Sequence, residues 1–192
     1  MQKEDKTASK GVASGIPVYC AFDELADIGS LKPHPRNPNR HPESQIALLA
    51  KIIKAQGWRA PITVSNRSGY IVRGHGRLLA AQLLGVKQVP VDRQDYASDE
   101  EELADLIADN RVAELAEMDR LSLAELLREI EAAGLDLEIA GFTKTDMAML
   151  VAEVSATDAS SISHDDGSDS SETSEQGGAA VRCPWCGYEF VP

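Results

Sequence analysis

The sequence predicts an α+β fold, a small mixed sheet with helices that is followed by an acidic helical extension. Two observations carry this prediction. Short runs of β-forming residues alternate with apolar stripes of helical period as far as residue 97. Every patterned segment beyond residue 98 is helical, and the first of these segments opens with a run of acids. Strands and helices that mix and then give way to helices alone are typical of α+β proteins.

Composition divides the 192 residues into five parts. Residues 1–17 are polar and are expected to be disordered. Residues 18–97 hold the strands, and residues 98–154 form the helical extension. Residues 155–180 consist largely of Ser, Asp and Gly, which bury too little apolar surface to offset the entropy of ordering, so we expect a disordered linker. Residues 181–192 form a tail that contains CPWCG.

The sheet region begins with a strand and a proline-rich loop. Residues 24–33 alternate enough to form a strand. Residues 33–42 follow as an extended loop, because four prolines forbid a helix or a central strand there. Residues 43–56 carry an apolar stripe, and Gly57 ends this helix. The segment PITVSNRSGYIV predicts two short strands joined by a hairpin at NRSG.

Helices dominate the remainder of the chain. A helix from about residue 76 to residue 84 ends at the following glycine, and KQVPVDR is another short strand. Ser98 with Glu101, and Ser122 with Glu125, form capping boxes that predict the starts of two helices in the extension. The segment TKTDMAMLVAEV predicts a third helix there.

Charge is strongly segregated along the chain. The whole protein has a formal net charge of −12, but residues 31–97 hold eleven Lys and Arg against three acids, a net of +8. Residues 98–154 hold four bases against sixteen acids, a net of −12. The basic region has the electrostatic footprint of a nucleic-acid-binding surface. In the alternative interpretation, the acidic helices simply neutralise the basic domain within one fold.

The sequence contains no export or membrane signal. No run approaches the roughly 18 apolar residues of a membrane span, and the N-terminus lacks the apolar core of a secretory signal. Three cysteines, two of them in one CxxC, do not make a disulfide framework. We therefore expect a cytoplasmic protein, in a bacterium or a phage-infected cell, with no membrane partner.

The segment GYIVRGHGRLLAAQLLG passes directly from a strand into a helix, with Arg73, Gly74, His75, Gly76 and Arg77 at the junction. Backbone N–H groups at such a helix start can bind an anion, and phosphate is the usual occupant. The glycines allow close approach of the backbone, and the arginines can fork onto phosphate oxygens. His75 can donate a hydrogen bond or act as an acid or base. By spacing alone, a plain connection between strand and helix stays open as an interpretation.

Five segments follow one another in the order LKPHPRNPN, IIKAQGWRAPITV, YIVRGHGRLLAAQLLG, VPV and DEEELADLIADNRVAELAEMD. This order resembles the ParB N-terminal domain of the ParB/sulfiredoxin fold, over roughly residues 20–120. The chain looks most like the version that is fused to, or encoded beside, phage and bacterial DNA methyltransferases. The tail AAGLDLEIAGFTKTDMAMLV extends the similarity to about residue 154.

The resemblance implies a pocket for a nucleoside triphosphate with magnesium. By this resemblance, Gly57, Ala60 and Pro61 line the nucleotide, and the junction residues Arg73–Arg77 hold its phosphates. Asp109 and Asn110 reach the magnesium ion and the phosphate oxygens, as expected of a hard cation on oxygen ligands.

Basic and amide side chains of the central region are candidates for contacts to nucleic acid. By the resemblance, Arg36 and Asn37 of the proline loop complete the nucleotide pocket or contact nucleic acid. The full set of candidates is Arg36, Asn37, Arg40, Arg59, Arg73 and Arg77.

The chain departs from the family pattern in ways that bear on activity. Partition ParB has GERR where this chain has GHGR, so His75 and Gly76 replace an acid and an arginine, and its ENxxR box becomes DNRVA, with Ala113 in the arginine slot. The sulfiredoxin cysteine would fall at His75, which excludes that activity. Kinase relatives place an acidic base there, so His75 is a candidate catalytic acid or base of a different kind. We find no helix-turn-helix pattern, and the acidic helices fit self-association or partner docking.

Cys183 and Cys186 in CPWCG resemble one knuckle of a zinc ribbon. A structural zinc ion takes four ligands, and this knuckle supplies two. Three interpretations stay open: two chains share one zinc ion, a second knuckle has been lost, or the pair binds no metal. The shared site predicts half a zinc ion per chain.

Four further features have plain structural interpretations. Trp58 follows the helix-ending glycine and is expected to plug the core rather than to stack on a base. His34 and His41 are expected to be solvated loop histidines, although phosphate contact is an alternative. Glu100–Glu102 are expected to form a solvated first helical turn.

These features together predict an accessory module for DNA transactions that binds nucleotide or nucleic-acid phosphates through GHGR and the basic region. The expected partners are DNA, a DNA methyltransferase or another DNA-processing protein, and a second copy of the chain. One alternative is an enzyme, either a nuclease or a nucleotide-dependent kinase or NTPase with His75 as acid or base. The sequence shows no carboxylate cluster beside the glycines, which weighs against two-metal nuclease chemistry. The other alternative is a protein-interaction adaptor with a vestigial pocket.

Overall fold

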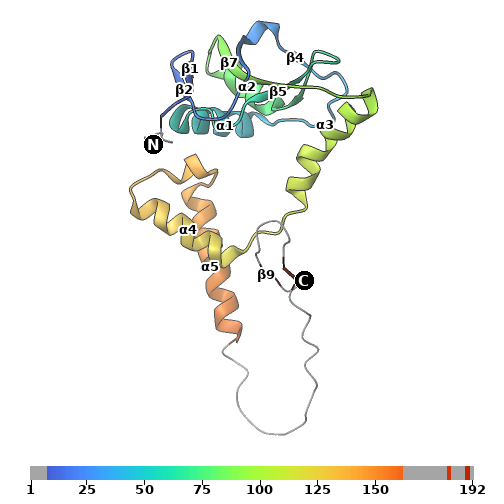
Figure 1. Cartoon of the computed structure of the whole chain (residues 1–192). Coiled ribbons are helices and arrows are strands. Elements are labelled where there is room, and N and C mark those ends of the chain that lie inside the picture. The colour runs from blue at the N-terminus through green and yellow to red at the C-terminus, as the bar shows by residue number, and fades with distance from the viewer. Residues whose placement is uncertain (1–7, 162–180, 183–188, 191–192) are drawn as a thin grey trace, which may run out of the picture. The chain divides into compact units, whose positions relative to one another are not determined.

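The computed structural model describes residues 8–161, 181–182 and 189–190, and it has the predicted α+β fold (Figure 1). A five-stranded mixed sheet and its helices are followed by a helical extension. Within the described residues, no helix is long and apolar enough to cross a membrane.

The strands of the sheet lie in the order β3 (Glu24–Asp27), β7 (Gln88–Gln94), β5 (Ile62–Ser65), β6 (Tyr70–Arg73) and β4 (Lys32–Pro33). Strand β7 is antiparallel to β3 and parallel to β5. Strand β6 is antiparallel to β5 and parallel to β4. The antiparallel β5–β6 pair is the predicted hairpin. Its short turn is sufficient because the strands are antiparallel, whereas parallel pairs need longer crossover connections.

Strand β5 lies in the middle of the sheet and is buried along its whole length. Because successive residues of a strand point to opposite faces, its two faces differ in polarity. Ile62 and Val64 belong to the hydrophobic core. Thr63 and Ser65 lie on the other face, toward helix α3 (Asp99–Glu114), where Ser65 donates a hydrogen bond to Glu102.

Helices α1 (Glu43–Gln56) and α2 (His75–Leu83) pack against each other and contribute to the core on the apolar side of the sheet. Ile53 of α1 and Leu78 of α2 are buried there beside Ile62. Trp58, which follows α1, is fully buried, so the predicted core plug is confirmed. The starts of α1 and α2, the hairpin turn and β7 all lie within one or two residues of the predicted positions.

The expectation that residues 1–17 are disordered is wrong for the part that the structure describes. Strands β1 (Gly11–Ala13) and β2 (Ile16–Val18) form an antiparallel hairpin. Its tight turn places Ser14 and Gly15 at positive φ, and Ala13 and Val18 are fully buried. Burial of these two small apolar side chains orders a segment whose composition alone looks polar.

The single strand expected over residues 24–33 is also wrong in detail. It divides into β3 and β4, with a 3-10 turn at Ile28–Ser30 between them. The carboxylate of Asp27 accepts a hydrogen bond from the backbone N–H of Gly29, which stabilises the turn. The chain therefore leaves one edge of the sheet as β3 and reaches the opposite edge as β4.

The extension contains helices α3 (Asp99–Glu114), α4 (Arg120–Ala132) and α5 (Lys144–Ser161), with a 3-10 turn at Leu137–Ala140. The hydroxyl of Ser98 caps α3 as predicted, by accepting from the backbone N–H of Glu101. The predicted cap of the next helix is wrong. Asp119 caps α4, because its carboxylate accepts from the N–H groups of Leu121 and Ser122.

Helices α4 and α5 share a small core made of Ala124, Leu127, Leu137 and Leu150. Helix α5 continues to Ser161, so the expectation that residues 155–161 belong to a disordered linker is wrong. The rest of that linker, residues 162–180, lies outside the described residues. So do Cys183 and Cys186, between the short paired strands β8 (Val181–Arg182) and β9 (Glu189–Phe190).

Candidate phosphate-binding cleft

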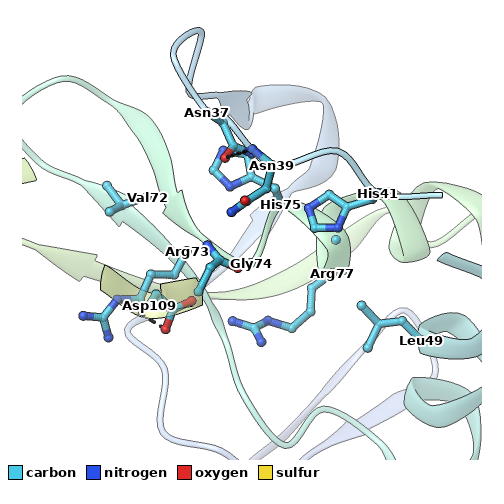
Figure 2. Close-up of a pocket in the computed structure, with 12 residues that line it drawn as sticks. Asn37, Asn39, His41, Leu49, Val72, Arg73, Gly74, His75, Arg77 and Asp109 are labelled. Carbon is cyan, nitrogen blue, oxygen red and sulfur yellow. Dashed lines mark hydrogen bonds and ion pairs between the residues drawn. The ribbon is translucent and has the colours of Figure 1, made fainter. Parts of the chain in front are cut away.

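A cleft of about 140 Å³ opens where β6 turns into α2, at the GHGR junction (Figure 2). It is formed by the end of β6, the start of α2, the proline loop, α1 and α3. The lining residues are Asn37, Asn39, His41, Leu49, Val72, Arg73, Gly74, His75, Gly76, Arg77, Asp109 and Asn110. Pockets that enclose a drug-sized ligand measure about 300–1,000 Å³, so this cleft fits the phosphate end of a ligand rather than a whole nucleotide.

Gly74 begins the helix in a conformation that suits glycine. It is the N-terminal cap of α2, with φ 90° and ψ 27°, in the left-handed region. A Cβ atom at this position would lie 3.0 Å from Nε of Arg77. The first turn of α2 contains no acid and receives no side-chain cap. The positive end of the helix is therefore not neutralised by its own residues, as an anion site requires.

Arg77 supplies the buried cation of the cleft. Its Nε is buried and has no hydrogen-bond partner. Burial lowers the pKa of the guanidinium below its usual value, and the nearby Asp109 opposes this effect in part. Figure 2 shows the guanidinium directed to the side of the cleft where Asp109 lies. A buried donor without a partner is costly, so an acceptor from outside the chain would stabilise this arrangement.

Gly76 allows the proline loop to pack closely against the start of α2. A Cβ atom there would lie 3.3 Å from Nδ1 of His41 and 3.4 Å from Cδ2 of Leu49. His41 is held in turn by a hydrogen bond of 3.0 Å between its Nδ1 and Oε1 of Gln45, the first turn of α1. The second glycine of GHGR therefore serves close packing rather than an unusual backbone angle.

His75 is neutral and its Nε2 is occupied. Burial, with smaller contributions from His41 and His34, lowers the pKa of His75 to about 4. Its Nε2 accepts a hydrogen bond of 3.2 Å from the backbone N–H of His34. This contact leaves the proton on Nδ1, so His75 offers a donor to an anion. The sequence made His75 only a candidate catalytic acid or base, and with its Nε2 occupied the Nδ1–H is the ring group that remains to contact a ligand.

A buried network connects His75 to α3, and the sequence did not predict it. His34 and Glu102 are both buried rather than solvated, contrary to expectation. Nδ1 of His34 accepts from the N–H of Arg36, and its Nε2 lies 3.5 Å from the Glu102 carboxylate. Glu102 also accepts hydrogen bonds of 2.6 Å from the hydroxyls of Ser65 and Ser68. Sequence patterns gave no signal for it, because burial of these residues depends on how α3 packs.

Arg73 lies at the cleft but is already paired. Its guanidinium donates two hydrogen bonds to the Asp105 carboxylate and lies 3.8 Å from Oδ1 of Asp109. Burial raises the pKa of Asp105, but the hydrogen bonds from Arg73 and Tyr96 outweigh it and lower the pKa overall. Arg73 thus mainly links β6 to α3. Because its guanidinium is already paired with carboxylates, it is less available to a phosphate than the guanidinium of Arg77.

Asp109 and Asn110, the candidate magnesium ligands, line the cleft from α3. Magnesium in nucleotide sites is commonly held by one or two protein carboxylates together with substrate phosphates. Asp109 and Asn110 fit such a partial ligand set, with the remaining oxygens supplied by phosphate. Among the described residues, no group of three or more His, Cys, Asp or Glu side chains could hold a metal ion by itself.

The other candidate residues lie outside the lining of the cleft. Gly57, Ala60 and Pro61 lie after α1, where Gly57 has φ 74° and a Cβ would lie 2.6 Å from the Pro17 carbonyl oxygen. Arg59 lies over the ring of Tyr19, 4.1 Å from its centre.

The proline loop contributes amides to the cleft and exposed bases beside it. Asn37 and Asn39 line the cleft, and the N–H of Asn39 donates to Oδ1 of Asn37. Arg36 and Arg40 of the same loop are exposed. The sequence predicted Asn37 as part of the site, gave phosphate contact by His41 only as an alternative, and did not predict Asn39.

The fold and the cleft together define a small α+β domain with a candidate anion site at a strand-to-helix turn. A family model described as the ParB N-terminal domain matches residues 22–110. The ParB-like nuclease domain-containing protein YnaK of Escherichia coli (strain K12) is 38% identical over 64 residues, which cover 33% of this chain and 72% of YnaK. The chain belongs to the ParB N-terminal domain family.

Solved ParB structures are also similar to this chain. C-terminally truncated ParB of Caulobacter crescentus, complexed with CTP-gamma-S, matches with a TM-score of 0.48 and 26% identity, over 67% of this chain and 69% of that one. The Pnob8-like ParB-N domain matches with a TM-score of 0.39 and 19% identity, over 59% and 49% of the two chains.

Proposed function

We propose that the cleft binds the phosphate groups of a nucleoside triphosphate. The observation that carries this proposal is the buried, unpartnered Nε of Arg77 beneath the left-handed Gly74 at the start of α2. Free backbone N–H groups, the Nδ1–H of His75 and the amides of the proline loop supply further donors. Together they form an anion site that is built before any ligand arrives.

Magnesium would arrive with the phosphates. Asp109 and Asn110 of α3 would hold the ion from one side of the cleft, and phosphate oxygens from the other. The ion would supply charge neutralisation, which the cleft needs because the carboxylate of Asp109 lines it. This chain's own contribution is to bind and orient the phosphates through α2 and the proline loop.

We also propose that the domain acts in DNA transactions beside a DNA-processing enzyme such as a methyltransferase. Family membership and the net charge of +8 over residues 31–97 support this role. Arg36 and Arg40 are exposed and adjoin the cleft-lining Asn37 and Asn39 in the sequence, so they are the best candidates for contacts to DNA phosphates. Binding of duplex DNA should weaken linearly with the logarithm of salt concentration, by about 0.9 in slope for each phosphate neutralised.

The nucleotide proposal is tested by calorimetry with ATP, CTP and GTP in the presence of magnesium. We expect at least one nucleotide to bind, and Arg77→Ala to weaken that binding by at least about tenfold, because a charge-assisted contact is lost. Arg128→Ala removes an exposed arginine of α4 and is the matched control. No binding of any nucleotide, or equal weakening in both variants, would contradict the proposal.

A further inference from the structure

His34 lies between helix α3 and the phosphate cleft. It follows β4 directly, and only 9% of the residue is exposed. Its backbone N–H, its carbonyl oxygen and both of its ring nitrogens contact other groups of the chain. A residue that is held at all of its polar groups has little freedom to move, so its partners fix the start of the proline loop.

These contacts determine which ring nitrogen of His34 carries the proton. Nδ1 accepts a hydrogen bond of 3.1 Å from the N–H of Arg36, so the neutral ring carries its proton on Nε2. Nε2 lies 3.5 Å from Oε1 of Glu102, a residue that is 3% exposed. The ring of Tyr70 meets the imidazole edge-on, with ring centres 5.4 Å apart. The proton is therefore on the nitrogen beside the buried carboxylate.

Glu102 is itself held in one orientation. Its Oε2 accepts a hydrogen bond of 2.6 Å from the hydroxyl of Ser65, and its Oε1 accepts one of the same length from the hydroxyl of Ser68. The hydroxyl oxygen of Ser65 accepts in turn from the backbone N–H groups of Arg67 and Ser68 in the hairpin turn. The carboxylate therefore has a fixed position relative to the sheet, and the ring of His34 is aligned against it.

The backbone of His34 continues the connection to the cleft. Its N–H donates a hydrogen bond of 3.2 Å to Nε2 of His75, which leaves the proton of His75 on Nδ1. Its carbonyl oxygen accepts a hydrogen bond of 3.1 Å from the N–H of Asn37. His75 and Asn37 both line the cleft. A shift of His34 would therefore displace donors on two sides of the candidate phosphate site.

We propose that Glu102 is a positioning residue for the phosphate cleft. Through the ring of His34, it holds the proline loop in place and presents the Nδ1–H of His75 to a bound anion. The inference deepens the proposed function, and it rests on that function where the binding of phosphate is concerned. Donors that are aligned before a ligand arrives bind it more tightly, because less conformational freedom is lost on binding.

The positioning is tested by ¹⁵N NMR of the histidine rings in the ligand-free full chain at neutral pH. We expect the Nε2–H tautomer for His34 and the Nδ1–H tautomer for His75. Glu102→Gln and His34→Asn should each shift His75 toward a mixture of its two tautomers. The Asn oxygen can still accept from the N–H of Arg36, so His34→Asn removes the contact with α3 and keeps the turn. Glu100→Gln, an exposed acid of the same helical turn, is the control and should leave the spectrum of His75 unchanged.

The effect on binding is tested by calorimetry with magnesium and the nucleotide that the wild type binds best. We expect Glu102→Gln and His34→Asn each to raise the Kd by roughly fivefold, with the number of sites per chain unchanged. The double variant should bind no more weakly than the weaker single variant, because both changes break one connection. A purely structural role would instead lower the number of sites through unfolding and leave the Kd of the folded fraction unchanged.

Three results would overturn the proposal. They are a wild-type His75 with its proton on Nε2, an unchanged His75 spectrum in both variants, and losses of affinity that multiply in the double variant. The expected tautomers and tautomer changes in a chain that binds no nucleotide would support the positioning of His75 and contradict the proposed function alone.

Discussion

Gly74 does two things at once in the cleft. Its positive φ turns the chain from β6 into α2, and its missing Cβ leaves room for the Arg77 guanidinium. The sequence indicated only that the two glycines of the junction allow close approach of the backbone. The structure separates its role from that of Gly76, which serves the contact with His41.

The first prediction concerns Gly74→Ala. A residue with a Cβ in this backbone region is strained by about 1–3 kcal/mol, and the new Cβ would also press on Arg77. We expect a lower free energy of unfolding in urea and loss of phosphate binding. Gly85→Ala is the control, because Gly85 also has positive φ but nothing near its Cβ position. If the Gly85 variant lost nucleotide binding equally, strain alone would explain the result.

The second prediction concerns the pH dependence that His75 gives to stability. Burial lowers its pKa from 6.5 to about 4, so between these values the unfolded chain binds a proton that the folded chain does not. The free energy of unfolding therefore falls as the pH drops through this window, by at most about 1.4 kcal/mol per pH unit from this group. Above pH 6.5 the group is neutral in both states and has no effect.

This pH dependence is measured by urea unfolding at pH 7.5, 6 and 5. His75→Gln has no titrating group, and its amide oxygen can replace the acceptor for the His34 N–H. We expect the variant to lose less stability than the wild type on acidification. Parallel losses in the two proteins would show that His75 titrates normally and would contradict the buried, neutral state.

At the residue scale, the sequence predicted the part of the cleft that is formed by one local motif. It did not predict the residues that reach the site through long-range packing. The glycines, the histidine and Arg77 are adjacent in sequence, so a local motif reveals them. Asp109 and Asn110 lie far along the chain and came from the family resemblance. His34 and Glu102 carry no pattern of their own, because only the packing of α3 buries them.

At the scale of elements, α3 is the helix of the acidic extension that packs against the sheet. It is attached to the sheet by Glu102, which contacts Ser65, Ser68 and His34, and by Asp105, which pairs with Arg73. Both carboxylates lie in the first two turns of the helix. Among the acids that begin α3, Glu102 is therefore structural, whereas Glu100 and Glu101 are exposed as expected.

The third prediction tests this attachment through Glu102→Gln. The amide cannot satisfy two hydroxyl donors and a histidine as the carboxylate does, so we expect a loss of about 1–3 kcal/mol of unfolding free energy. Glu100→Gln changes an exposed acid of the same turn and should change stability by less than about 0.5 kcal/mol. Chemical denaturation of the two variants under one set of conditions makes the comparison. Equal stabilities would mean that the buried network does not anchor α3.

Helices and the hairpin were predictable at this scale because their signals are local. The capping of α3 by Ser98, the stop at Gly57 and the NRSG turn are short motifs with one physical cause each. The N-terminal hairpin was missed because its ordering comes from burial of Ala13 and Val18 against the core. The cap of α4 was missed because two good capping residues, Asp119 and Ser122, lie one turn apart.

At the scale of the whole molecule, the C-terminal tail carries the predicted zinc knuckle. Cys183 and Cys186 lie outside the described residues, and the zinc knuckle stays a prediction. The fourth prediction is a metal content of half a zinc ion per chain in a dimer, because two knuckles complete four thiolate ligands. Elemental analysis of purified protein, combined with its mass in solution, decides the question. One tightly held zinc ion in a monodisperse monomer would contradict the shared site.

The two main parts of the sequence differ in net charge. Residues 31–97, which supply all of the cleft lining except Asp109 and Asn110, carry a net charge of +8, whereas residues 98–154 carry a net charge of −12. A net charge of −12 would otherwise disfavour contact with phosphate. The proposed binding of phosphate therefore depends on the local geometry at the start of α2, where Arg77 is the central residue.

The most direct test is the NMR resonance of the Arg77 Nε–H group, assigned by its absence in Arg77→Lys. This donor is buried and lacks a partner in the structure. We predict that addition of the bound nucleotide with magnesium shifts the resonance strongly, because a phosphate oxygen becomes its acceptor. The Nε–H resonance of Arg128 should stay unchanged. An Arg77 resonance that does not move while nucleotide binds would place the phosphates elsewhere and contradict the account.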